Sequence, residues 1–250
     1  MILEIQSMLK FSRYLLVCPL LFHPFNDVFG QLTFFNVSSS DITEARKISA
    51  QQQFEIHDEI ESSTTVTYGL GKGWEVGLNL INLDYGLQSK HFEKNDTSTV
   101  IPYAPLLLAN AQKAFKLNDT FSIGVGAVAG KNLTRNHHSQ LVYYTYTNLI
   151  ATLGNQDQYQ IVAGSYYGNH RYLSDGPSYG FQTGIDAGLW YKKLHFLADW
   201  ISGSNGKGRL TAGFEVFLTQ RLPLALGWQR SNQDGSQGVV LQLTFLPRGN

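Results

Sequence analysis

Phe121-Ser122-Ile123-Gly124-Val125-Gly126-Ala127 decides the fold, because apolar residues hold its odd positions while serine or glycine holds its even positions. The same scheme returns in Leu210-Thr211-Ala212-Gly213-Phe214-Glu215-Val216 and in the closing stretch Val239-Val240-Leu241-Gln242-Leu243-Thr244-Phe245. Alternation with a period of two is the pattern of a β-strand that has one apolar and one polar face. These stretches therefore predict antiparallel β-structure.

The alternation recurs along nearly the whole chain. Past Gln31 no segment keeps a helical apolar stripe of useful length, apart from a weak helical pattern over Asp41 to Lys47. We count about twelve segments, each near the roughly 9–11 residues that a tilted membrane strand needs. They lie near residues 47–57, 61–70, 73–87, 102–116, 120–130, 140–152, 156–167, 178–191, 194–203, 206–218, 222–231 and 236–247.

The connections alternate between short and long. Tight turns are expected at residues 71–73, 117–119, 155–157, 192–193 and 220–223, and longer polar loops at 88–101, 131–139, 169–178, 203–208 and 231–237. An up-and-down barrel places all short turns at one rim and all long loops at the other, as outer-membrane barrels do. A soluble Greek-key sandwich, the competing interpretation, has no reason to sort its loops in this way.

The first thirty residues differ from the rest. Lys10 and Arg13 precede an apolar run from Tyr14 to Phe22, and small or apolar residues lead up to Gly30, which together predict a secretory signal peptide over residues 1–30. Met8 is an alternative start that gives a shorter n-region. The run is too short to cross a bilayer as a helix. We expect residues 31–250 to form one barrel domain without a disulfide, since Cys18 is the one cysteine.

Composition and motifs exclude several function classes. The 19 basic residues balance the 19 acidic residues, so no basic field exists to attract nucleic acid. His137 and His138, with the more distant His91 and His170, do not have the spacing of a metal site. No phosphate-cradling or dinucleotide motif is present in context. We therefore expect no metal and no cofactor.

The polar positions of the strands carry mainly Gly, Ser, Thr and Gln with scattered charges, which suits a crowded, hydrated interior. Such inward charges either form a constriction that selects solutes or pair with one another and fill the barrel, and the sequence leaves both open. The predicted lumen-lining residues are Glu75, Gln182, Asp186, His195, Asp199, Arg209, Glu215, Gln229 and Gln242.

Aromatic residues gather near the ends of the predicted strands, as in the two aromatic belts of a membrane barrel. Tyr and Phe are also good strand formers in general, so the clustering matters more than any single residue. The predicted membrane-interface residues are Tyr68, Trp74, Tyr103, Phe115, Phe121, Tyr143, Tyr179, Tyr191 and Trp200.

With its leader, its Gly-rich strands and a last strand that reaches Phe245, the chain resembles bacterial outer-membrane barrel proteins, particularly those of Bacteroidota-type organisms. The text Tyr68-Gly69-Leu70-Gly71-Lys72-Gly73-Trp74-Glu75-Val76-Gly77 is similar to recurring segments of an outer-membrane family linked to phenol-degradation pathways. The resemblance implies outer-membrane lipids and the barrel-assembly machinery as partners. The sequence departs from many such barrels because residues 246–250 follow the terminal aromatic.

Three functions are compatible with this barrel. The favoured one is a passive channel or uptake porin for small solutes, hydrophobic or aromatic ones if the resemblance holds. The second is a non-conducting structural or surface-binding barrel. The third is a lipid hydrolase, because His137 and Ser139 partly resemble the His-x-Ser arrangement of outer-membrane hydrolases. Gln140-Leu141 replaces the Asn-Gly that usually follows, and no orienting acid is evident, so we assign no catalytic residue and expect no enzyme.

Overall fold

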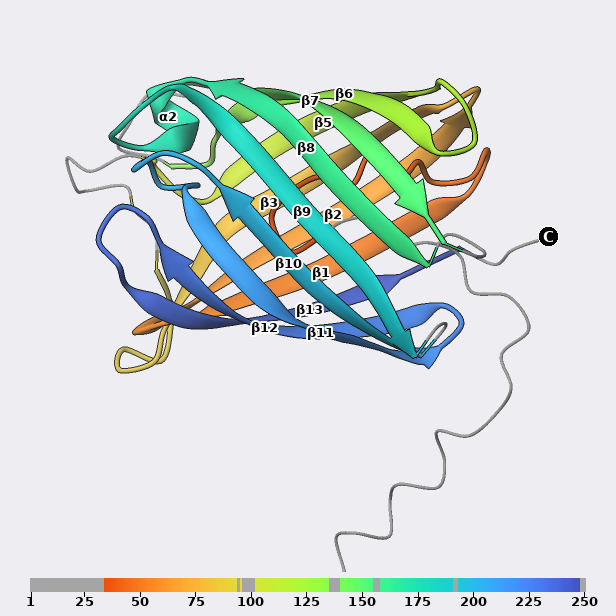
Figure 1. The fold of residues 1–250 in the computed structure, drawn as a ribbon. Helices are drawn as coiled ribbons and strands as arrows, with labels where there is room; N and C mark the ends of the chain where they lie inside the picture. The colour runs from red at the N-terminus through yellow and green to blue at the C-terminus, as the bar shows by residue number, and fades with distance from the viewer. Residues whose placement is uncertain are drawn as a thin grey trace, which may run out of the picture.

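In the computed structural model the chain forms a closed barrel of tilted strands (Figure 1). The structure describes residues 34–93, 95, 102–134, 140–154, 158–190 and 193–247. Within these ranges, twelve long antiparallel strands make the wall, and the two-residue β4 (Phe92–Glu93) and the helix α2 (His170–Leu173) lie in loops. The wall strands are β1 (Ile48–Ile56), β2 (Glu59–Gly71), β3 (Trp74–Gly86), β5 (Leu106–Lys116), β6 (Phe121–Asn132), β7 (Leu141–Leu153), β8 (Tyr159–Gly168), β9 (Tyr179–Trp190), β10 (Leu194–Ile201), β11 (Arg209–Thr219), β12 (Leu222–Ser231) and β13 (Gln237–Phe245).

The wall closes because the first and last strands pair. Each wall strand is antiparallel to the wall strand that follows it in sequence, and β1 pairs with β13 in a register that sets Gln53 opposite Gln242. Closure leaves no free sheet edge, so the strands satisfy their backbone N–H and C=O groups without water. The predicted up-and-down barrel is confirmed, and every predicted strand is found within a few residues of its expected bounds.

The loops sort by length as predicted, with one exception. The connections that contain residues 87–105, 133–140, 169–178, 202–208 and 232–236 all lie at one rim, and the tight turns and the described C-terminal end lie at the other. At the long-loop rim, β1 and β2 are joined by His57 and Asp58 alone. This short hairpin lowers the rim at one place.

The two faces of the wall differ in polarity. The outer face exposes large apolar side chains on every wall strand, including Leu78, Leu141, Phe181 and Leu226, which are 56–71% exposed. Soluble monomers rarely expose continuous apolar patches of more than a few hundred square ångströms. The inner face buries a long series of polar side chains. An apolar exterior around a polar interior is the arrangement of a barrel that stands in lipid.

The structure corrects one prediction near the N-terminus. Residues 41–47 form no helix; they run as extended chain and a turn, with an isolated bridge between Ala45 and Gly69. The backbone N–H groups of Thr43 and Arg46 donate to Glu75 and Gly69 of the wall, and these bonds outweigh a weak local preference for helix. In the described part of the chain, no helix is long and apolar enough to cross a membrane. The predicted signal peptide, Met8 and Cys18 lie outside the described residues.

Candidate functional site in the barrel lumen

The nine side chains predicted to line the lumen all lie on the inward positions of their strands. Arg209 keeps 16% of its side chain exposed, and the other eight residues are no more than 9% exposed. The structure does not gather them at one height. It divides them among an outer group near the long loops, an inner group near the tight turns and a set that holds the chain's own N-terminal region.

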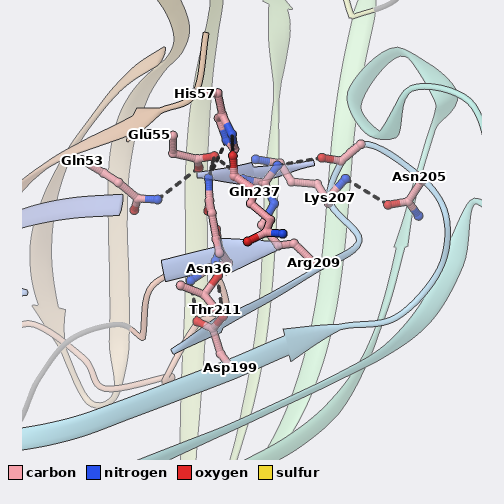
Figure 2. A network of polar contacts seen from close by, with 12 residues as sticks. Asn36, Gln53, Glu55, His57, Asp199, Asn205, Lys207, Arg209, Thr211 and Gln237 are labelled. Atoms are coloured by element: carbon pink, nitrogen blue, oxygen red, sulfur yellow. Dashed lines mark hydrogen bonds and ion pairs between the residues drawn. The ribbon is translucent and has the colours of Figure 1, made fainter. Parts of the chain in front are cut away.

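The outer group centres on an ion pair between Arg209 and Glu55, whose side chains are both largely buried (Figure 2). The Gln229 side-chain amide donates to Glu55 Oε2 at 2.9 Å and lies 2.8 Å from His57 Nε2. Arg209 also donates to the carbonyl of Gly206 at 2.8 Å. We did not predict Glu55 or His57, although Glu55 shares the inward parity of Gln53 on β1.

A hollow of about 600 Å³ opens beside this network, at the place where the short β1–β2 hairpin lowers the rim. Its lining is mostly polar and acidic. It consists of Ile56, His57, Asp58, Glu59, Glu61, Asp84, Asp234, Ser236 and Gln237. The hollow is a charged recess at the long-loop rim, next to the network of Glu55 and Arg209.

An aromatic wall faces the lumen on β7 and β8, about half-way round the barrel from β13 in strand order. The Tyr144 ring stacks on Tyr166 with 5.6 Å between centroids, and it lies 5.2 Å from Tyr172 of α2 and 6.1 Å from Tyr146. The Tyr144 hydroxyl donates to Gln182 at 2.9 Å. The sequence pattern could have shown this wall, since Tyr143 points outward and Tyr144 and Tyr146 take the opposite parity.

The inner group joins Asp186, His195 and Glu215. His195 Nδ1 lies 2.7 Å from Asp186 Oδ1. Glu215 on β11 is the cross-strand neighbour of His195. Within the described part of the chain, His195 Nε2, Glu215 Oε2 and both amide atoms of Gln242 have no hydrogen-bond partner. Among the described residues, no three His, Cys, Asp or Glu side chains are placed to hold a metal ion.

Residues 34–45, which we call the luminal segment, run through the interior of the barrel. Figure 1 shows them as a red-orange coil inside the wall. Asp199 accepts a hydrogen bond from the backbone N–H of Asn36 at 2.6 Å, and Glu75 accepts one from that of Thr43 at 2.7 Å. Two of the predicted lumen charges therefore bind this segment. Sequence reasoning did not foresee it, because its contacts are not local: Thr43 and Glu75 are 32 positions apart, and Asn36 and Asp199 are 163 positions apart.

The predicted interface aromatics lie toward the two rims. Tyr68, Trp74, Phe115 and Phe121 are exposed near the tight turns, Tyr179 and Trp200 are exposed near the long loops, and Tyr103 and Tyr143 are half-buried there. At the tight-turn rim, three basic side chains lie over aromatic rings: Lys113 over Trp74 at 5.3 Å, Lys193 over Trp190 at 4.6 Å and Arg221 over Phe245 at 4.6 Å. Long basic side chains take such positions at membrane interfaces. Tyr191, His137, His138 and Ser139 lie outside the described residues.

Comparisons with solved structures place the fold. The chain is similar to a KdgM porin, with a TM-score of 0.56 at 11% identity, covering 79% of this chain and 98% of the porin. It is similar to a KdgM porin in complex with disordered oligogalacturonate, with a TM-score of 0.54 at 11% identity and the same coverage. A NanC porin matches with a TM-score of 0.54 at 9% identity, covering 81% of this chain and 100% of that one. No protein-family model and no curated protein matches the sequence.

A closed wall with a lipid-compatible exterior, a polar lumen and loops sorted by length defines the class. The protein is an outer-membrane β-barrel of porin-like architecture.

Proposed function

We propose that the protein is a passive outer-membrane channel for small solutes that carry a ring and polar groups. The observation that carries the proposal is the two-sided lumen, which sets an ion-pair network of Glu55 and Arg209 against an aromatic wall built around Tyr144. Tyrosine faces stack on ring-bearing solutes, and the charged side offers hydrogen bonds to their polar substituents.

The outer hollow supports an entry route from the long-loop side. Its volume of about 600 Å³ is within the range of small-molecule sites. The resemblance of residues 68–77 to a family linked to phenol degradation points to the same solute class; in the structure these residues form the β2–β3 turn and its flanks. The Bacteroidota-type origin, the outer-membrane lipids and the assembly machinery stay predictions.

Planar-bilayer recording of the refolded mature chain tests the proposal. We expect discrete conductance steps, and we expect ring-bearing solutes such as phenyl glycosides to lower the ion current more than linear polyols of similar mass. Tyr144→Leu should remove this difference between solutes, whereas Tyr144→Phe, which keeps the ring, should retain it.

A non-conducting barrel is the second candidate, and the luminal segment favours it because residues inside the barrel occupy space that a solute would cross. The same recordings separate the two. A folded, heat-modifiable barrel that shows no steps at any voltage, in the native chain or in variants that free the luminal segment, would refute the channel.

A further inference from the structure

We propose that the luminal segment is a removable plug, bound in the lumen as an extended peptide, and that its departure opens the channel; this rests on the channel function proposed above. Four of the wall side chains that bind it are called the seat: Glu75, Asn148, Asp199 and Thr211. They come from four different strands, β3, β7, β10 and β11, so the seat exists only in the closed barrel.

The tip of the segment is held by specific hydrogen bonds (Figure 2). The Asn36 side-chain amide donates to Asp199 at 3.2 Å and to Thr211 at 2.8 Å. Asp199 also accepts from the backbone N–H of Asn36 at 2.6 Å and of Val37 at 3.3 Å. A carboxylate that accepts two successive backbone N–H groups recognises a peptide rather than a single side chain.

The two phenylalanines of the segment fit notches in the wall. Phe34 packs with Ile150 and Val162 on one side, and Phe35 packs with Leu197 and Val240 on the other.

The notches are made by glycines. A Cβ at Gly184 would lie 3.2 Å from the Phe34 ring, and one at Gly227 would lie 2.8 Å from Phe35. A Cβ at Gly124 would lie 1.8 Å from the Ser40 hydroxyl, much closer than any real contact. The glycines therefore give the wall the shape of the segment.

The middle and the base of the segment are held by wall side chains that bind its backbone. The Asn148 amide donates to the Ser38 carbonyl at 2.7 Å, and Gln112 donates to the Asp41 carbonyl at 3.2 Å. At the base, Glu75 accepts from the Thr43 N–H at 2.7 Å. The segment is thus bound along its whole length.

Several features allow the segment to leave while the wall stays intact. Every wall strand keeps its two neighbours without it, because it contributes no strand to the ladder. Arg46, with φ 65°, lies between the segment and β1 and provides a turn about which the segment can swing. The four seat side chains are hydrophilic, so water can replace their hydrogen bonds to the segment, and the burial of Phe34 and Phe35 is what opposes its departure.

Cysteine bridging in the full chain tests the plug. In a Cys18→Ser background, Asn36→Cys and Thr211→Cys are joined by a short bis-methanethiosulfonate, which forms a disulfide with each thiol and releases methanesulfinate, and single channels are recorded before and after reduction. We expect the bridged protein to stay closed and the openings to return on reduction. The control carries Thr211→Cys alone and receives the same reagent, which places it at the same position without tethering the segment and leaves Asn36 and Asp199 in place.

A second variant changes the seat without a bridge. Gly227→Ala crowds Phe35, and we expect an open probability about tenfold higher, in line with the cost of overpacking. Adding Phe35→Leu should restore the native value. If the bridged protein opens as often as the reduced one, the plug is refuted and the channel stands. If no variant conducts although the barrel is folded, the channel itself is refuted, and the plug with it.

Discussion

Replacing Phe34 with alanine should free the luminal segment by a calculable amount. Phe34 is 1% exposed and belongs to a buried cluster with Val37, Ile150 and Val162. Burying a phenylalanine side chain contributes about 1.5–3 kcal/mol, and about 1.4 kcal/mol corresponds to a factor of ten in population. Phe34→Ala should therefore raise the population of the displaced segment roughly 10- to 150-fold.

Thiol labelling measures this population. Val37 is fully buried, so Val37→Cys in a Cys18→Ser background places a reporter that a membrane-impermeant maleimide reaches only when the segment is displaced. When displacement is fast, the labelling rate follows the displaced population. The matched control is Phe214→Ala, which removes the same ring from the outer face, where Phe214 is 51% exposed. A rate that rises less than about threefold in Phe34→Ala, or as much in the control, would refute the reasoning.

Three further predictions concern the wall, the loops and the lumen. Leu226→Arg places a charge on the lipid face near the middle of β12. In urea titrations of the protein in vesicles, it should lower the free energy of unfolding by about 2–4 kcal/mol. An equal loss in urea titrations in aqueous buffer without lipid would contradict a lipid-facing position. The backbone N–H and hydroxyl of Ser236 donate hydrogen bonds to Asp234 and lower its pKa from 3.8 to about 2. Because the folded pKa is the lower one, the stabilisation of this loop is present above about pH 4 and is lost as the pH falls toward 2. Ser236→Ala removes the hydroxyl and should raise the pH midpoint of the Asp234 carboxyl in a carbon NMR titration. Glu55→Gln leaves Arg209 without its carboxylate partner and should lower the free energy of unfolding by about 3 kcal/mol in the same urea assay. Adding Arg209→Gln should recover much of this loss. An unchanged urea midpoint in Glu55→Gln would show that the pair is fully solvated.

The wall of this barrel could be predicted from its sequence because the determinants are local. A strand such as Phe121–Asn132 shows its two faces in alternate residues, and turns such as those at residues 71–73 and 117–119 are marked by Gly, Asn or Asp. The parity that set Glu215 and Gln229 apart from their outward neighbours also placed them in the interior. The lumen candidates came from this rule alone.

The luminal segment could not be predicted, because its determinants are not local. Residues 34–45 have no periodic pattern, and Asn36 finds its partners on β10 and β11, which lie far away along the chain. The weak helical pattern at residues 41–47 gave the wrong structure for the same reason, since the Thr43 N–H bonds to Glu75 on the wall rather than within a helix. Glu55 was missed because its partners Arg209 and Gln229 lie 154 and 174 positions away along the chain.

Fractionation of expressing cells, followed by electrophoresis of unheated and boiled detergent samples, tests the membrane barrel most directly. The account predicts recovery in the outer membrane and a band that migrates differently before and after boiling, because a closed barrel resists detergent until it is heated. A soluble protein whose band does not shift would contradict a lipid-facing exterior and return the alternation of its strands to a water-facing sandwich.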